Sequence, residues 1–247
     1  MEKVHILNIG IQNLTEQQLL ESLNEGVLFT PNVDHLLNLQ RDKEFYECYQ
    51  KAEWVICDSM ILYLCSKLLP QRIIQAIPGS TFLSRFYMYH QDDPDIRFFL
   101  LGAAPGVPQE AMRRINARVG RKIVIGAHSP SFGFEKDSQE IEEIIDLINQ
   151  SGATVVVVGV GAPKQEKFII HYRDRMPDVK IWMALGATID YEAGNKQRAP
   201  RIFQRLAIEW FYRMCTNPRL VKRYVSDLAF FPSFIAQLMG KYKNPFA

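Results

Sequence analysis

The chain has 247 residues, of which 47% are apolar and 23% charged, a composition typical of a globular protein with one large core. The net charge of +2 conceals a split: residues 1–195 carry −6 (19 bases, 25 acids), and residues 196–247 carry +8 (ten bases, two acids). The composition excludes a disordered chain, and no apolar run reaches the roughly 20 residues that a membrane span needs.

Hydrophobic patterning predicts strands that alternate with helices through most of the chain. In chain order it predicts strand 4–9, helix 15–24 capped by Thr15, strand 27–30, helices 34–41 and 43–51, strand 54–57, helices 59–68 and 79–90, strand 96–101, helix 105–119, strand 122–126, helix 138–149, strand 154–158, helix 163–174 and strand 179–185. This order implies right-handed crossovers. We therefore expect a Rossmann-like parallel sheet with helices on both faces.

The last part of the chain has a different pattern. Residues 196–247 contain no predicted strand and two predicted helices, 200–214 and 218–231. We therefore divide the chain into a Rossmann-like α/β domain, 1–195, and a basic helical appendage, 196–247. Because this basic segment follows an acidic body, we expect a polyanionic partner, such as a lipid surface, a nucleic acid or a phosphorylated substrate.

The most informative motif is TVVVVGVGAPKQE at 154–166. Four valines predict a buried strand, Gly159 and Gly161 end it, and Pro163 opens a helix. Parallel sheets hold ligands at such strand–turn–helix junctions, and a helix start favours anions. Lys164 and Gln165 are therefore candidates to bind a diphosphate or a sugar hydroxyl, although a solvated first helical turn explains them equally well. The motif is neither a Walker loop nor a complete GxGxxG.

Polar residues follow other predicted strands, which predicts a shared cleft at their carboxyl ends. Asp58 follows an apolar strand and is either a general base or the N-cap of the helix predicted at Ser59. Thr30 and Asn32 flank Pro31 and could line a site or serve only a turn. Asp190 could bind ribose hydroxyls or cap a helix. Gly102 ends a further strand.

The basic appendage contains arginines that could bind phosphate oxygens in pairs. They are Arg213, Arg219 and Arg223. A solvated basic face is the alternative. The four cysteines are scattered and read as reduced core residues, and the five histidines show no metal-binding spacing.

Several motifs together resemble those of the WecG/TagA/CpsF glycosyltransferases (glycosyltransferase family 26), which include enzymes of teichoic-acid and enterobacterial-antigen synthesis. The matching segments are 30–35, 58–59, 78–80, 101–103, 161–166, 186–194, 198–200 and 209–213. They occur in family order across nearly the whole chain.

The resemblance implies an inverting, metal-independent transfer of a hexose or N-acetylhexosamine from a UDP-sugar to a polyprenyl-diphosphate-linked sugar, with no cofactor. It implies that Asp58 is the base and that Thr30 and Gln165 match the family's functional Thr and Gln. It also implies that Arg213 and Arg223, with Arg219 displaced by one residue, close over the diphosphate. On this basis we expect a cytoplasmic protein bound peripherally to the inner face of the membrane.

Two departures from the family pattern, Ala76 and Phe134, leave the donor sugar open. The sequence also does not identify the acceptor or the linkage, and a homo-oligomer is possible. One alternative is a dinucleotide-dependent oxidoreductase or epimerase, which would need GxGxxG after the first strand; residues 9–12 offer none. A catalytically inert sugar-nucleotide binder is another. A nucleic-acid-binding module is disfavoured, because the aromatic residues near Arg213 have the spacing of packing residues.

Overall fold

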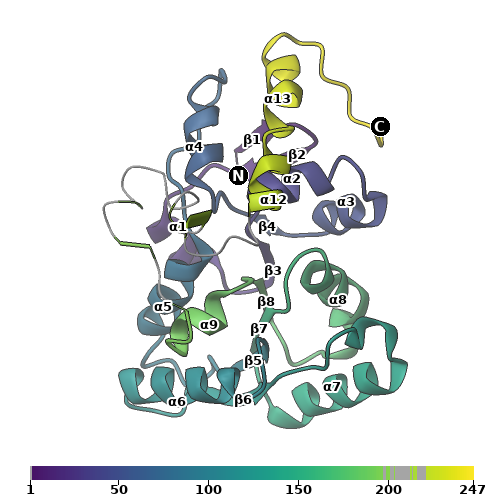
Figure 1. The fold of residues 1–247 in the computed structure, drawn as a ribbon. Coiled ribbons are helices and arrows are strands. Elements are labelled where there is room, and N and C mark those ends of the chain that lie inside the picture. Colours follow the sequence, from purple (N-terminus) through teal and green to yellow (C-terminus); the bar gives the residue numbers. More distant parts are fainter. Residues whose placement is uncertain (1, 197–198, 201–202, 204–211, 213, 216–220) are drawn as a thin grey trace.

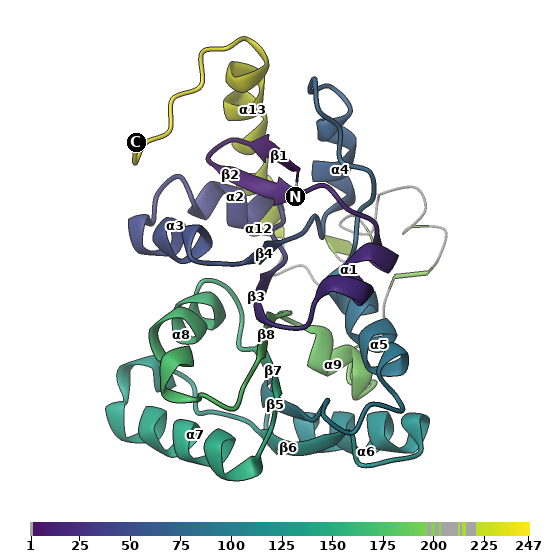
Figure 2. The ribbon, with the colours of Figure 1, turned by 180° about the vertical axis from the view of Figure 1, so that it is seen from behind.

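The computed structural model describes residues 2–196, 199–200, 203, 212, 214–215 and 221–247. These residues form a six-stranded parallel sheet in the order β4-β3-β8-β7-β5-β6 and a separate antiparallel hairpin, β1-β2 (Figure 1). Helices cover both faces of the large sheet, as Figures 1 and 2 show from opposite sides. The predicted α/β class with a Rossmann-like parallel sheet is confirmed.

Apart from the two N-terminal strands and a short helix at 188–192, the element bounds in the first 195 residues follow the predicted pattern. The strands are β1 (Lys3–Ile6), β2 (Ile9–Gln12), β3 (Gly26–Phe29), β4 (Trp54–Val55), β5 (Phe98–Gly102), β6 (Val124–His128), β7 (Val155–Gly159) and β8 (Ile181–Ala184). The α-helices are α1 (Glu16–Ser22), α2 (Val33–Asn38), α3 (Lys43–Gln50), α4 (Met60–Ser66), α5 (Gly79–Tyr89), α6 (Val107–Val119), α7 (Ser138–Ser151), α8 (Lys164–Tyr172), α9 (Thr188–Glu192), α12 (Val221–Asp227) and α13 (Phe230–Leu238). Two 3₁₀ turns are η1 (Phe134–Lys136) and η2 (Arg173–Arg175).

Strand alternation divides the core into two layers. In β7, Val156 and Val158 pack into one layer, while Val155 and Val157 pack into the other. The first layer is completed by α2, α3, α7 and α8, and the second by α1, α5, α6 and α9. All four valines are fully buried, as expected for a parallel strand covered on both faces.

The N-terminus differs from the prediction of one strand over 4–9. The chain turns at Leu7, whose φ is 53°, and returns as β2. Gln12, the last residue of β2, donates from Nε2 to the Glu53 carbonyl (2.6 Å) and accepts from the Val55 N–H (2.5 Å). The hairpin thereby satisfies backbone groups of the edge strand β4, which would otherwise be open to pairing. Thr15 caps α1 through a reciprocal bond with Gln18, as predicted.

The C-terminal helices also differ from the prediction. The helix predicted over 200–214 lies largely outside the described residues. The one predicted over 218–231 is described from 221 onward and is two helices, α12 and α13. Pro232 does not end the second helix, because it lies in the first turn, where a missing N–H removes no helical hydrogen bond. No helix in the described ranges is both long and apolar enough to cross a bilayer.

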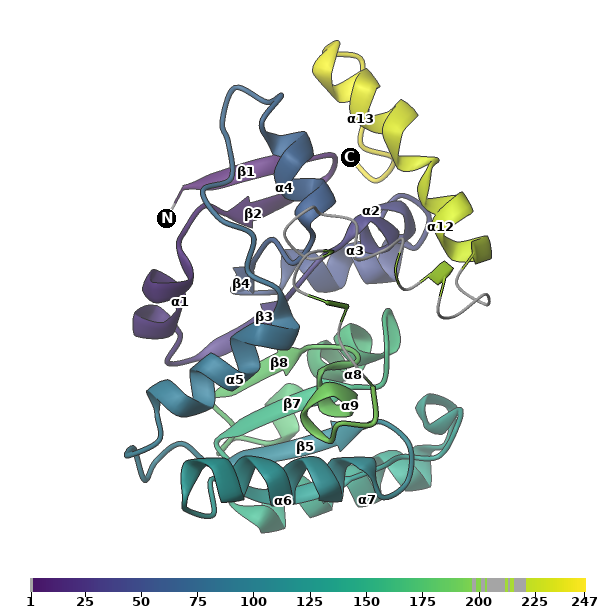
Figure 3. The ribbon, with the colours of Figure 1, turned by 60° about the vertical axis from the view of Figure 1, so that its left-hand side comes forward.

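The C-terminal segment 221–247 packs on the N-terminal elements, beside α2 and the hairpin (Figure 3). Phe230 and Phe234 are buried in the same core layer as the hairpin residues. The Gln237 side chain accepts from the Leu7 N–H and donates to the His5 carbonyl, both at 2.8 Å. The appendage therefore contributes Phe230 and Phe234 of α13 to the core of the α/β domain, whereas α12 has no buried residue.

Candidate functional site

The carboxyl ends of the six parallel strands lie at one edge of the sheet, and the loops that follow them carry most of the predicted site residues. Thr30 follows β3, Asp58 follows β4, and Gly102 ends β5. The loop after β7 carries Gly161, the start of α8 carries Lys164 and Gln165, and α9 after β8 carries Asp190. This edge is the expected ligand position in an open α/β sheet.

Asp58 and Thr30 meet at the start of α5. The Gly79 N–H donates to Asp58 Oδ1 at 2.7 Å, so the half-buried carboxyl group lies at a helix N-terminus. A Cβ added to Gly79 would lie 3.4 Å from Thr30 Oγ1, which donates to the Ala184 carbonyl at 3.3 Å. Asp58 does not cap the helix that begins next to it, because Ser59 fills that position and accepts from the Leu62 N–H. The N-cap alternative for Asp58 is therefore wrong.

Three glycines form a close backbone contact across neighbouring strand ends. A Cβ on Gly102 would lie 2.5 Å from the Gly159 carbonyl, and a Cβ on Gly159 would lie 2.6 Å from the Gly186 oxygen. Gly102 also has a φ of 132°, which disfavours other residues. The strand ends therefore approach one another as bare backbone, and we call Gly102, Gly159 and Gly186 the glycine seam.

Gln165 is buried and joins two loops. Its Oε1 accepts from the N–H groups of Gly161 and Gly186, both at 3.2 Å. Its Nε2 donates to Glu166 Oε1 at 2.9 Å. Because Gly186 lies two residues after Ala184, which Thr30 contacts, Gln165 and Asp58 lie at the same edge. The alternative of a solvated first helical turn is wrong for Gln165.

A buried polar cluster lies beneath this edge. His35 Nδ1 is 2.9 Å from the Tyr49 hydroxyl. Burial, together with the nearby positive charge of Arg223, lowers the pKa of His35 to about 3, so the ring is neutral. Burial raises the pKa of Tyr49 well above its usual value, as do the charges of Glu166 and Asp58. Tyr49 is therefore an electrostatic neighbour of both carboxyl groups.

Lys164 borders a pocket of about 320 Å³ at this edge. The pocket is formed by the loops after β5, β6 and β7, with residues 103–105, 130–134, 159–160 and 164. Phe132 at its rim is fully exposed, and the Lys164 ammonium lies 5.0 Å from its ring centroid. Lys164 also pairs with Glu135 at 2.8 Å, an interaction that lowers the pKa of Glu135. The pocket thus combines an aromatic surface with a cation.

The remaining predicted residues have local partners. Asn32 caps α2 by accepting from the His35 N–H at 3.2 Å. Asp190 accepts from Asn195 Nδ2 (2.9 Å) and pairs with Lys196 Nζ (2.7 Å), so it fixes the exit from α9. Asp190 does not cap a helix, because the N-cap of α9 is Ala187.

Of the three candidate arginines, only one is described. Arg223 on α12 pairs with Asp34 in the first turn of α2 at 3.2 Å. This places its guanidinium next to the loop that carries Thr30 and Asn32. Arg213 and Arg219 lie outside the described residues.

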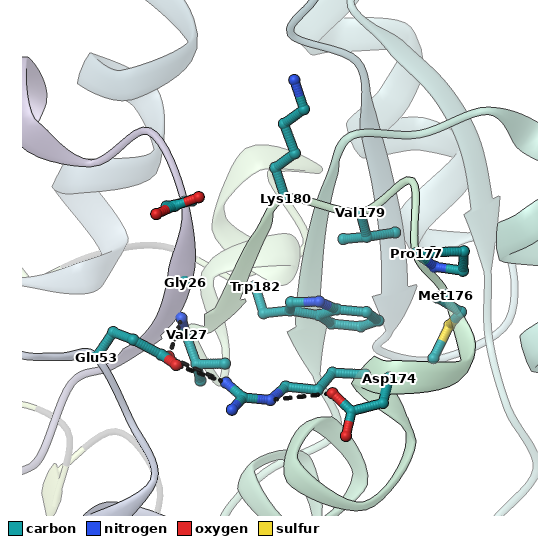
Figure 4. A pocket seen from close by; sticks show the side chains of 11 residues that line it. Gly26, Val27, Glu53, Asp174, Met176, Pro177, Val179, Lys180 and Trp182 are labelled. Carbon is teal, nitrogen blue, oxygen red and sulfur yellow. Dashed lines mark hydrogen bonds and ion pairs between the residues drawn. The ribbon is translucent and has the colours of Figure 1, made fainter.

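A larger pocket, of about 520 Å³, lies at the opposite edge (Figure 4). It is lined by residues from the amino ends of β3 and β8, including Gly26 and Trp182. Arg173, which lines the pocket, donates to both carboxylate oxygens of Glu53 at 3.0 Å. This pocket contains none of the predicted site residues, so the two hollows are separate.

Cys57 adjoins Asp58 at this edge, and its thiol is unsuited to act as a nucleophile. Cys57 is buried, and its pKa is raised to about 12 by burial and by the Asp58 charge, so the thiol stays protonated. In the described ranges, no group of three His, Cys, Asp or Glu residues could hold a metal ion. Gly10, which an oxidoreductase would need in a phosphate-binding loop, lies within β2 instead.

Three residues of this edge were not among the predicted site residues, although the matching segments 78–80 and 161–166 contain two of them. Gly79 supplies the N–H for Asp58, Glu166 is buried and accepts from Gln165, and Phe132 lines the pocket. The sequence contained one signal for the buried start of α8, which is helical spacing. Phe168 and Ile169 follow Gln165 by three and four residues, so they share its helix face, and both are buried.

The family model described as "Glycosyl transferase WecG/TagA/CpsF family" matches residues 4–244, nearly the whole chain.

Proposed function

The chain belongs to the WecG/TagA/CpsF family of glycosyl transferases, and from this we propose that it transfers a hexose or N-acetylhexosamine from a UDP-sugar to a polyprenyl-diphosphate-linked sugar. The observation that carries the proposal is the meeting of Asp58 and Thr30 at the start of α5, on the same edge as the loops joined by Gln165. A family assignment alone names the reaction class. This geometry supports the proposal, because it places a carboxyl group at the edge where open α/β sheets hold ligands.

The proposed chemical step is a single displacement. The acceptor hydroxyl oxygen attacks the anomeric carbon, the bond from that carbon to UDP breaks, and the hydroxyl proton passes to Asp58. Inversion follows because attack and departure occur on opposite faces of the sugar. General base catalysis of this kind contributes about 100- to 10,000-fold. The Gly79 N–H supports the role by fixing one carboxylate oxygen at 2.7 Å.

The leaving diphosphate requires positive charge and N–H donors. We assign the UDP to the pocket beside Lys164, where the start of α8 directs N–H groups and a positive dipole end toward an anion. Phe132 supports this assignment, because an exposed aromatic ring can stack on a base. Arg223 would add charge from the appendage, as would Arg213 and Arg219. The proposed reaction needs no metal, and unchanged turnover in excess EDTA tests this.

We propose that the appendage docks on an anionic membrane surface. Apolar side chains are exposed along α12 and α13, including Val225, Leu228 and Ile235. Exposed Leu64 and Leu68 belong to α4 and the turn after it, which project at the same end of the molecule (Figures 1 and 3). Basic side chains on the segment would add about 1 kcal/mol each near anionic lipid.

A pair of charge insertions tests the docking surface. Ile235→Glu should weaken sedimentation with vesicles that contain anionic lipid. Leu147→Glu is the matched control, because Leu147 is an exposed leucine on α7, at the other end of the molecule. Equal vesicle binding by both variants would count against a membrane role for α13.

The base assignment is tested by Asp58→Asn, which keeps an oxygen acceptor for the Gly79 N–H but cannot take up a proton. We expect turnover of a UDP-sugar with a short-chain lipid diphosphate acceptor to fall about 100- to 10,000-fold, with UDP binding retained. Asp174→Asn, at an exposed carboxylate near the opposite edge, is the control. Full turnover by Asp58→Asn would refute the assignment.

A further inference from the structure

Glu166 is a buried carboxyl group at the candidate site that the proposed reaction does not use. Its side chain is fully buried near the start of α8. Oε1 accepts from Gln165 Nε2 at 2.9 Å, whereas Oε2 is buried without a hydrogen-bond partner among the described residues. A carboxyl group held in this way lowers the stability of the fold, so a requirement other than stability is needed to explain its presence.

The contact with Gln165 selects one of two amide orientations. A primary amide has an oxygen acceptor and a nitrogen donor, which exchange positions when the group flips. With Nε2 directed at Glu166, Oε1 faces the N–H groups of Gly161 and Gly186. In the flipped orientation, the nitrogen would face two N–H donors and the oxygen would face the carboxyl group. Glu166 therefore makes the observed orientation the favourable one.

The orientation of Gln165 sets the relation between two loops of the site. Its oxygen is the common acceptor for the loop after β7 and the loop after β8, each at 3.2 Å. Both N–H donors belong to glycines with positive φ, 87° at Gly161 and 50° at Gly186, so the backbone itself provides little restraint on these loops. The Gln165 oxygen thus adds a side-chain link between the two loops to the backbone hydrogen bond from the Leu185 N–H to the Val158 carbonyl (3.1 Å).

We propose that Glu166 is a positioning residue, which fixes the Gln165 amide so that its oxygen holds the two glycine loops at the spacing that a nucleoside diphosphate requires. The inference rests on the proposed function for the identity of the ligand. Burial raises the pKa of Glu166 to about 7. In either protonation state the carboxyl group keeps an oxygen that can accept from Gln165 Nε2, so the positioning persists across neutral pH.

Two substitutions separate positioning from simple packing. Glu166→Gln keeps an oxygen acceptor of the same shape, whereas Glu166→Leu fills similar space without one. Leucine also removes an incompletely paired carboxyl group, so we expect its melting temperature to be equal to or above that of the wild type. If Glu166 had only a packing role, both variants would show the same loop exchange and UDP affinity, and any loss of function would parallel a loss of stability.

The first measurement is hydrogen–deuterium exchange of the free protein, over peptides that contain residues 159–163 and 185–187. We expect Glu166→Leu to exchange faster in both segments and Glu166→Gln to match the wild type, because exchange reports local opening. Unchanged exchange in Glu166→Leu would overturn the proposal, and so would equally faster exchange in both variants.

The second measurement is UDP affinity by calorimetry. Glu166→Leu should raise the Kd for UDP about tenfold, the loss expected for one misplaced hydrogen-bonding group, and Glu166→Gln should keep the wild-type value within about twofold. Equal affinity in all three proteins would overturn the role in ligand binding. If the wild type itself does not bind UDP, the proposed function fails, whereas the exchange result still decides whether Glu166 positions the loops.

Discussion

Glu166→Gln should change how stability depends on pH, because the substitution replaces a buried ionisable group by a neutral one of the same shape. Burial raises the pKa of Glu166 from 4.5 to about 7 in the folded protein. Between those two values the folded state holds a proton that the unfolded state has released. Stability that depends on this proton is therefore present below about pH 4.5 and is lost as the pH rises through 7.

The size of the effect follows from the shift. At 1.36 kcal/mol for each pKa unit, a rise from 4.5 to about 7 corresponds to about 3 kcal/mol. Between pH 4.5 and 8, the free energy of unfolding of the wild type should therefore fall by that amount relative to that of Glu166→Gln. Other buried groups contribute as well: burial raises the pKa of Asp227 to about 6 and lowers that of His35 to about 3. They are common to both proteins, so they cancel in the difference.

The assay is urea unfolding of both proteins at half-unit steps from pH 4.5 to 8.5. The free-energy difference should increase with pH in favour of Glu166→Gln and level off above about pH 8. Glu143→Gln, at an exposed position on α7, measures the same chemical change in solvent. A difference that stays constant with pH, or one that favours the wild type at high pH, would refute the reasoning.

Three further predictions test the glycine seam, the pocket rim and the first helix. Gly102→Ala should lower the free energy of unfolding by at least about 2 kcal/mol more than Gly106→Ala does. Both glycines have positive φ, but only at Gly102 would an added Cβ come within 2.5 Å of Gly159, and equal urea midpoints would contradict this. Phe132→Ala should weaken UDP binding by about 1–3 kcal/mol in calorimetry with an unchanged melting temperature, and unchanged affinity would argue against stacking. Thr15→Ala should cost about 1 kcal/mol in thermal unfolding through loss of the capping box, while a loss below about 0.3 kcal/mol would show that the cap is dispensable.

The fold was predictable where burial and periodicity agree. The four valines of β7 present apolar side chains to both faces of the sheet, as is typical of a parallel strand covered on both sides. The alternation of strands with helices then limits the possible topologies. The hairpin was not predictable in the same way, because the pattern of residues 4–9 continues through the turn at Leu7. A positive φ at a leucine has no sequence signal, and it depends on the packing around it.

The candidate site was predictable in its location and less so in its contacts. Parallel strands place their carboxyl ends together, so Asp58 and Gln165 were expected at one edge. The sequence did not indicate that Asp58 would bond to Gly79, because this contact depends on how α5 packs across the sheet, 21 residues later. The buried position of Glu166 was equally hidden, since a glutamate in a first helical turn is ordinarily solvated. The roles of these residues in catalysis stay predictions.

The contact between Gln237 and the β1–β2 hairpin has a consequence for synthesis. The hairpin is made first, yet its turn bonds to a side chain 230 residues later, and the layer that it joins is completed by Phe230 and Phe234. A nascent chain can therefore assemble the central strands while its earliest residues still lack their final neighbours. Ribosomal stalling before residue 230 would leave an incomplete apolar surface, a substrate for chaperones and proteases rather than a shorter active enzyme.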